Sequence, residues 1–254
     1  MFHAQDYLVT RQFRENRFTT SVARQPDEIA QCLRLRQEVF SREWRMPGAM
    51  PVQVDKDHFD DYCKHLMVID NASGEVVATS RLLVDTDIIH TGCFYAETEF
   101  EISRVIDMPG KFMEIGHTCV HPDYRKGSVL ALLWQGVARV VALGRINSLI
   151  GYIGIPLSHG EQYINSLMHV LRNKHYAPAG QRVRPLTTLK TSTTAISEDL
   201  IMSIPLKAYL RQGAVVCGEP SLNEDLGVAN LFVLMEGKKI VSRYRRHFTG
   251  RGWD

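Results

Sequence analysis

The chain has 254 residues, of which 44% are hydrophobic and 23% are charged. This composition is typical of a globular protein with a full core, and it excludes a disordered or fibrous chain. Thirty basic and 28 acidic side chains give a net charge of +2, so no global positive field indicates a nucleic-acid partner.

The five cysteines stand singly, without a CxxC pair. Their spacing argues against a disulfide framework and against a metal site, and it fits a reducing cytoplasm. The start of the chain lacks an apolar run of signal-peptide length. The most apolar stretch, residues 128–144, contains Gln135 and Arg139 and is too short to span a bilayer. We therefore expect a cytoplasmic protein, soluble or peripheral on the inner membrane.

The first half of the chain predicts an arm, a helix and a hairpin. Residues 1–25 are polar and rich in arginine, and we interpret them as an N-terminal arm or covering segment ahead of a domain over 26–254. Apolar spacing predicts a helix from Pro26 to about residue 44, before a loop broken by proline and glycine. Residues 65–84 predict a hairpin, because two apolar runs flank the turn Asn-Ala-Ser-Gly.

The middle of the chain alternates strands and helices. We predict a strand over 112–120, an amphipathic helix up to residue 144, a strand over 148–157 and a helix over 161–173. Residues 174–203 are polar and show no period, which is typical of a functional loop.

A short helix over 206–211 and strands over 214–217 and 231–235 are predicted to follow, before a turn at 236–238 and a basic tail. The mixed order of strands and helices favours one α/β (α+β) domain.

The most informative segment is EIGHTCVHPDYRKGS, residues 114–128. A strand feeds a short basic loop that opens a helix, and the unpaired backbone N–H groups of such a first turn bind anions. The alternative is an ordinary strand–turn–helix with solvated basic residues.

This segment resembles the acyl-donor site of the GNAT acyltransferase superfamily. Further motifs resemble, in order, the acyl carrier protein-dependent N-acyltransferases that make lyso-ornithine lipid: FDDYCKHLMVID, VATSRLLV, TEFEIS, LKAYLRQGAVVCGEP and SRYRRHF. The segment LRLRQEVF, with SRLLV and EISR, also resembles acyl-homoserine-lactone synthases and long-chain N-acyl amino acid synthases. The resemblance covers roughly residues 28–250. It implies a GNAT-like fold with a twisted, mostly antiparallel sheet, flanked by helices and split near its middle.

The resemblance also implies where an acyl-phosphopantetheine donor, on acyl carrier protein or coenzyme A, would lie. Its arm would follow the splayed strand and its phosphate would lie on the loop; the residues concerned are Cys119, Val120, Arg125, Lys126, Gly127 and Ser128. No permanently bound cofactor and no metal is expected.

Three segments depart from the ornithine-lipid pattern. His117 and Thr118 replace Arg and Ser, residues 151–154 are GYIG where the pattern has GCAS, and residues 225–230 are DLGVAN where it has DFNTAD. These departures fall in site segments, so they bear on the acceptor more than on the fold.

Acyl transfer to an amine needs a base, because an ammonium has no lone pair with which to attack. Glu114 at the donor strand is the first candidate, and Glu101 in the EISR segment is the second; each could instead be a structural acid. His65 could relay a proton or make a structural hydrogen bond. Cys119 is expected to be inert, as buried strand cysteines usually are.

Four further side chains are candidates for substrate binding. Arg81 and Arg104, like Arg125, suit a carboxylate or a phosphate, because guanidinium binds such anions in a bidentate manner. Asp60 belongs to the D…C…H-L pattern of the relatives. Strand alternation predicts that His117 shares a face with Cys119 and lies opposite Glu114, where it would supply positive charge only when protonated.

The C-terminal tail carries six positive charges: Lys238, Lys239, Arg243, Arg245, Arg246 and Arg251. It suits an acidic acyl carrier protein or an anionic membrane, or it is simply solvated.

Together these features predict transfer of a long-chain (3-hydroxy)acyl group from acyl carrier protein to an amino-acid amine, with L-ornithine the leading acceptor by resemblance. The alternatives are a synthase of N-acyl amino acids or acyl-homoserine lactones, a non-catalytic relative that binds acyl carrier protein or lipid, and a short-chain acetyltransferase.

Overall fold

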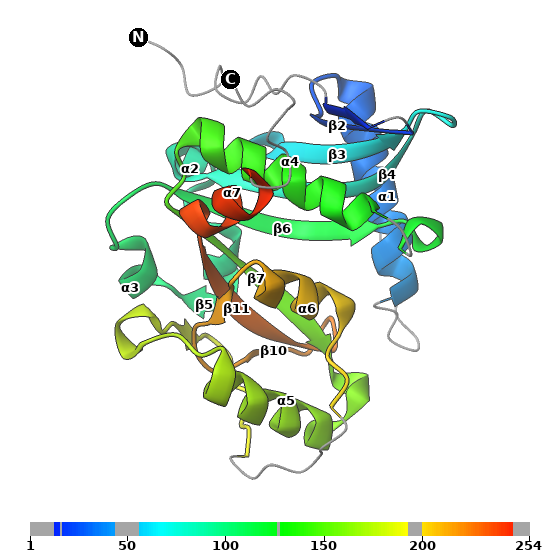
Figure 1. Cartoon of the computed structure of the whole chain (residues 1–254). Coiled ribbons are helices and arrows are strands. Elements are labelled where there is room, and N and C mark those ends of the chain that lie inside the picture. Colours follow the sequence, from blue (N-terminus) through cyan, green and yellow to red (C-terminus); the bar gives the residue numbers. More distant parts are fainter. Residues whose placement is uncertain (1–12, 16, 44–55, 126–127, 193–199, 246–254) are drawn as a thin grey trace.

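The computed structural model describes residues 13–15, 17–43, 56–125, 128–192 and 200–245 (Figure 1). Its helices of a full turn or more are α1 (Pro26–Glu43), α2 (Ile88–Thr91), α3 (Ser103–Ile106), α4 (Val129–Gly144), α5 (Glu161–Lys174), α6 (Ile204–Arg211) and α7 (Gly237–Arg245). Its strands are β1 (Phe13–Glu15), β2 (Phe18–Val22), β3 (Lys64–Asp70), β4 (Glu75–Val84), β5 (Phe100–Glu101), β6 (Phe112–Val120), β7 (Ser148–Pro156), β8 (Arg184–Pro185), β9 (Val215–Val216), β10 (Ser221–Asn223) and β11 (Val228–Glu236).

One large sheet organises these elements. Its strand order is β1-β2-β3-β4-β6-β7-β11-β10, and β9 pairs with β11 at the side. All described neighbours in this sheet are antiparallel except β6 and β7, which are parallel and are joined through α4. Strands β5 and β8 form a separate two-stranded ribbon. The GNAT-like fold class predicted from the sequence, a mostly antiparallel mixed sheet flanked by helices, is confirmed.

The two faces of the sheet carry different helices. Cys32, Leu35 and Val39 of α1 pack against β3, β4 and β6 on one face, which we call the α1 face. Helix α4 packs on the opposite face, the α4 face, where Leu133 and Val137 join the largest core cluster. Helices α4, α6 and α7 lie in front of the sheet in Figure 1, and α1 lies behind it.

Strands β6 and β7 pair over only three residues each, from Phe112–Ser148 to Glu114–Ile150. Beyond this point the strands splay apart. Gly151 lies at the fork, where a Cβ would be 2.3 Å from the carbonyl oxygen of Ile115. A glycine here lets the two strands approach closely just before they separate.

A β-bulge follows in the splayed half of β6. Thr79 of β4 faces Cys119 and Arg81 faces Gly116, so two β6 residues lie opposite Ser80. His117, in the bulge, has a φ of +49°, which is uncommon for a residue other than glycine. The extra residue shifts the alternation by one: Met113 and Ile115 face α4 before the bulge, and Val120 faces α4 after it.

Most predicted elements are confirmed with shifts of one to three residues at their ends: the helices α1, α4, α5 and α6, the hairpin β3–β4, and strands β6 and β7. The C-terminal strand β11 is also confirmed, although it is longer than predicted and begins at Val228.

Two predictions at the chain ends are wrong. The described part of the expected arm is not separate, because β2 pairs with β3 and is largely buried in the sheet. The expected turn at residues 236–238 starts α7 instead, with Ile240 and Tyr244 buried against the core. The Arg-rich composition of the first segment and the lysines of the second obscured these buried residues.

The close approach at Gly151 predicts a large effect of adding a single methyl group. We expect Gly151→Ala to lower the free energy of unfolding by about 1–3 kcal/mol, because the new Cβ would overlap the Ile115 carbonyl. Gly180→Ala is the control, since a Cβ there meets no atom within 4 Å and should change stability by less than about 0.5 kcal/mol. Equal urea midpoints for both variants would contradict this account of the fork.

Candidate active site

The carboxylate of Glu114 lies on β6 where the pairing with β7 ends. The residue is 4% exposed. Its two oxygens accept the backbone N–H groups of Tyr95 at 2.6 Å and of Ala96 at 2.7 Å, from the first turn of the short helix η4 (Tyr95–Thr98). The carboxylate is therefore held rigidly at the fork of the two strands.

Burial raises the pKa of Glu114 to about 7, against the opposing effect of the two N–H donors and of the Arg81 charge. A carboxyl with a pKa near 7 exchanges protons readily at neutral pH. This property is typical of a general base, so Glu114 remains the first candidate for that role.

Aromatic rings surround Glu114. The ring of Tyr95 stacks on that of Tyr152 of β7 at 5.7 Å between centroids, and it lies 5.1 Å from the ring of His117. Tyr152 in turn contacts Phe100 at 6.2 Å. These rings connect the two splayed strands across the fork.

His117 lies on the same face of β6 as Glu114, since both contact Tyr95. The expectation that His117 shares a face with Cys119 is correct, but the expectation that it lies opposite Glu114 is wrong. The bulge causes the difference, because it adds one residue to the alternation between Glu114 and Cys119. Burial, and next the charge of Arg81, lower the pKa of His117 well below its usual value. At neutral pH His117 is therefore uncharged and does not supply the positive charge of the arginine it replaces.

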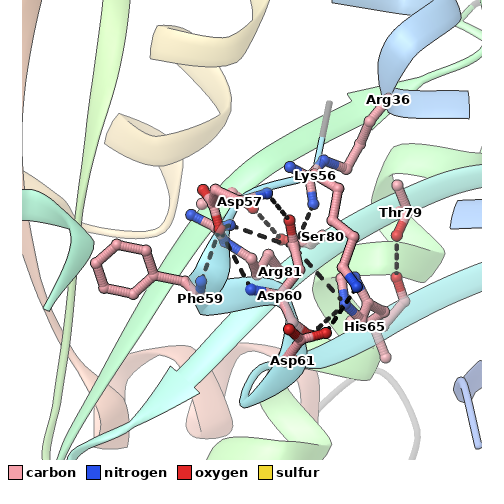
Figure 2. Close-up of polar contacts among 12 residues, drawn as sticks. Arg36, Lys56, Asp57, Phe59, Asp60, Asp61, His65, Thr79, Ser80 and Arg81 are labelled. Atoms are coloured by element: carbon pink, nitrogen blue, oxygen red, sulfur yellow. Dashed lines mark hydrogen bonds and ion pairs between the residues drawn. The ribbon is translucent and has the colours of Figure 1, made fainter. Parts of the chain in front are cut away.

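A buried ion cluster adjoins this site (Figure 2). Asp60, between α1 and β3, pairs with Arg36 of α1 at 2.6 Å and with Arg81 of β4 at 3.2 Å. Arg81 also donates to Asp57 at 2.6 Å, and its guanidinium lies 4.6 Å from the centre of the Tyr95 ring. Arg81 thus connects the ion cluster with the aromatic wall around Glu114.

Asp60 stays ionised in this cluster. Burial alone would raise the pKa of Asp60, but the charges of Arg36 and Arg81 outweigh it and hold the pKa below its usual range. His65 lies beside Asp60, with its Nε2 3.7 Å from the carboxylate and 3.4 Å from the backbone carbonyl. Burial lowers the pKa of His65, and the residue is 1% exposed. Its position suits a neutral imidazole that orients Asp60 more than a group that touches a substrate.

The expected phosphate loop lies at the other end of β6. Arg125 donates through Nε to the carbonyl of Val120 at 3.1 Å, and its guanidinium pairs with Glu43 at the end of α1. Ser128 is the N-cap residue of α4, and its side chain makes no capping bond. The expected loop residues Lys126 and Gly127 lie outside the described residues. Cys119 is buried against α1, as expected of an inert thiol.

Glu101 and Arg104 lie apart from the Glu114 cluster. Phe100 of β5 faces Tyr152, and the next side chain, Glu101, lines a surface cavity of about 540 Å³ together with Arg182, Arg184 and Glu219. Hydrogen bonds from Ser103 lower the pKa of Glu101, so it is a weaker base than Glu114. Arg104 is exposed on α3.

Four residues of the site were not singled out from the sequence: Arg36, Asp57, Tyr95 and Tyr152. Arg36 stands in the LRLRQEVF segment, and Asp57 precedes Asp60 by the three residues of a capping box, which the structure contains. Those two patterns could have indicated them. Tyr152 stands in the GYIG departure at residues 151–154, which could have indicated it, whereas Tyr95 has no comparable signal, because only the approach of η4 to β7 makes the two neighbours.

The described ranges contain no group of three or more His, Cys, Asp or Glu side chains suited to a metal ion. Among the same residues, no helix has both the length and the apolar character of a membrane span.

The ion cluster predicts a strong dependence of stability on Asp60. We expect Asp60→Asn to lower the free energy of unfolding by about 3–5 kcal/mol, because Arg36 and Arg81 would lose their shared buried anion. Asp61→Asn, which removes an exposed pair with Lys56, should change it by less than about 1 kcal/mol. Urea unfolding at pH 7 measures both.

The pH dependence gives an independent check of the same cluster. Because the pKa of Asp60 is lowered by folding, its stabilising effect is complete above the unfolded value of about 4 and is lost as the pH falls below it. The free energy of unfolding of Asp60→Asn should therefore fall less steeply below pH 4 than that of the wild type. Identical pH profiles of the two proteins would contradict a lowered pKa of Asp60.

Known proteins resemble this chain in sequence and in fold. Residues 35–135 match a family model described as an acetyltransferase (GNAT) domain. An L-ornithine N(alpha)-acyltransferase of Rhodobacter capsulatus is 28% identical over 249 residues, which cover 91% of this chain and 94% of that protein. A protein of the same name from Agrobacterium fabrum is also 28% identical, over 91% of this chain and 85% of its own length.

Solved structures share the fold at low identity. An N-acyl amino acid synthase from uncultured soil microbes aligns with a TM-score of 0.50 at 10% identity, over 91% of this chain and 94% of its own. The AHL synthase LasI aligns with a TM-score of 0.50 at 12% identity, over 87% of this chain and 90% of its own. The chain has the GNAT fold, and it resembles the L-ornithine N(alpha)-acyltransferases along nine-tenths of its length.

Proposed function

We propose that the protein transfers a long-chain (3-hydroxy)acyl group from the phosphopantetheine thioester of an acyl carrier protein to the α-amine of L-ornithine, which gives a lyso-ornithine lipid. The buried carboxyl of Glu114, with a pKa of about 7 at the fork of β6 and β7, is the observation that supports this chemistry most directly. The names of the relatives support ornithine as the acceptor.

In the proposed reaction the amine nitrogen attacks the thioester carbonyl carbon, so that a C–N bond forms and the C–S bond breaks. Glu114 takes the proton of the amine, directly or through a water molecule, and the thiolate leaves and is protonated in its turn. No covalent acyl-enzyme is needed, so an inert Cys119 is consistent with the proposal.

The splayed half of β6 supports the placement of the donor. Its pairing with β7 stops at Glu114, so β7 does not occupy the rest of that edge, and an extended pantetheine arm would lie along it. The first turn of α4, with Ser128 and Arg125 beside it, suits the phosphate at the other end of the arm.

Arg81 is our candidate for binding the acceptor's carboxylate. Its Nη2 is buried and has no hydrogen-bond partner among the described residues, and its guanidinium lies against Tyr95, which is bound to Glu114. A carboxylate at Nη2 would bring the α-amine of an amino acid toward Glu114. Asp60 and His65 would act through Arg81 as positioning residues.

The proposed donor and acceptor are both cytoplasmic, and we expect the protein to act there. The lyso-lipid product is amphiphilic, which favours release at a membrane. The basic C-terminal residues would support peripheral binding to the anionic inner membrane.

Removal of the base tests the mechanism. We expect Glu114→Gln to lower kcat by about 10²–10⁴-fold, because the amide cannot accept the proton. Free thiol release and the mass of the product measure the rate with palmitoyl-acyl carrier protein and ornithine. Glu75→Gln is the control, since Glu75 is an exposed carboxylate at the start of β4, and it should leave kcat unchanged. Full activity of the Glu114 variant would rule out Glu114 as the base.

The pH profile tests the same residue without removing it. Since the deprotonated fraction of Glu114 increases around its pKa of about 7, log kcat/KM should rise through pH 6–7 and show an inflection near pH 7. The Gln variant's residual rate should lack this inflection and follow only the ionisation of the amine.

A panel of amines tests the acceptor. We expect ornithine to give the fastest thiol release and a product mass of palmitoyl-ornithine, and Arg81→Lys to raise the KM for ornithine more than it lowers kcat. If only another amine gives a product, the N-acyltransferase reaction would be supported and ornithine would be rejected as the acceptor. Binding of acyl carrier protein without turnover on any amine would reject the enzyme and favour a non-catalytic relative.

A further inference from the structure

Helices α6 and α7 together form a basic surface beside the fork of the sheet. The surface consists of six exposed side chains: Lys207, Arg211, Lys238, Lys239, Arg243 and Arg245. Neither helix contains an acidic residue; the neighbouring Glu236 pairs with Lys238 and Lys239. Such a separation of charge differs sharply from the whole chain, whose net charge is only +2.

The two helices present these charges on one continuous surface. Arg243 of α7 donates to the backbone carbonyl of Arg211 at the end of α6, at 2.6 Å. A Cβ on Gly213, just after α6, would lie 3.7 Å from the side chain of Lys239. The ends of α6 and α7 are therefore in contact, and Figure 1 shows both in front of the sheet.

The buried side of α6 contacts the splayed half of β6. Tyr209 packs edge-on against Trp134 of α4, with 5.1 Å between ring centroids, and it contacts Thr118 in the bulge. Thr118 is hydrogen-bonded to Ser80 at 2.8 Å. Helix α6 thus borders the splayed strand on the α4 face, while its outer side carries Lys207 and Arg211.

An apolar residue lies at the end of this basic stripe. Ile204 is 66% exposed and precedes Lys207 and Arg211 by three and seven residues, which is the spacing of one helix face. A stripe with an exposed isoleucine at one end and cations along the rest is complementary to an acidic helix with an apolar side chain at its tip.

We propose that the α6–α7 surface is the docking site of the acidic acyl carrier protein, and that Lys207 and Arg211 of α6 are its main charge contacts. This inference rests on the proposed function, because it names the surface that receives the donor. Docking on α6 sets the carrier beside the splayed half of β6, so that its phosphopantetheine arm can reach Glu114 between the two strands.

Charge reversal with two donors tests the proposal. In Lys207→Glu/Arg211→Glu the KM for palmitoyl-acyl carrier protein should rise about tenfold or more, and the rise should shrink at high salt. The kcat, and the KM for palmitoyl-coenzyme A, should stay within about twofold of the wild type, because a small donor does not touch the surface. The control is Arg34→Glu/Lys174→Glu, which changes the net charge equally at exposed positions of α1 and α5 and should leave both KM values unchanged.

The outcomes separate this inference from the proposed function. No turnover by the wild type with either donor would reject the function. Normal turnover with an unchanged KM for the carrier in the α6 variant would reject the docking surface alone. An equal rise in the KM for both donors would also reject the docking surface, since it would indicate a damaged active site. Co-sedimentation with phosphatidylglycerol vesicles that is lost in the variant, with carrier kinetics unchanged, would assign the surface to an anionic membrane instead.

Discussion

The early end of pairing between β6 and β7 is the constraint on which the rest of the site depends. Only three residue pairs join these parallel strands, and Gly151 allows their close contact at the last point before they separate. Beyond this point β7 no longer pairs with β6, so the backbone groups on that edge of β6 need partners other than a β7 ladder. The rings of Tyr95 and Tyr152 cover one side of the opening, and α6 covers part of the other. A sheet that continued its ladder here would have no such opening.

Two carboxylates near this opening show how position determines protonation. At Glu114, burial outweighs the two backbone N–H donors and the charge of Arg81, so its pKa lies near 7. Asp60 is equally buried, but two guanidinium groups keep it ionised. Arg81 lies between the two groups and contributes to both environments. The fold therefore separates a carboxylate that can exchange protons from one that holds the structure in place.

The sequence predicted the helices and long strands because their apolar periods are strong, as in α4 and the β3–β4 hairpin. It also singled out Glu114 as a candidate base, since a glutamate at the start of a strand that leads into a basic loop stands out locally. It did not predict α7 or the sheet position of β2, because basic residues outnumber the few buried ones there. The partners of Glu114 could not be inferred either. Tyr95 lies 19 residues away in a short helix, and its contact arises from tertiary packing alone. The face of His117 was predicted incorrectly because a bulge has no sequence signature in this strand.

The bulge has a consequence for how β6 can change. Before the bulge the odd-numbered side chains of β6, such as Ile115, face α4. After the bulge the even-numbered Val120 faces α4. A substitution within the bulge changes one side chain and does not change which later side chains face α4. Deletion of one residue between Gly116 and Thr118 would restore simple alternation and turn every later side chain of the strand to the other face. Cys119 would then leave its place against α1, and Val120 would leave the main core. Length, more than residue identity, is thus the property that this part of the strand must preserve.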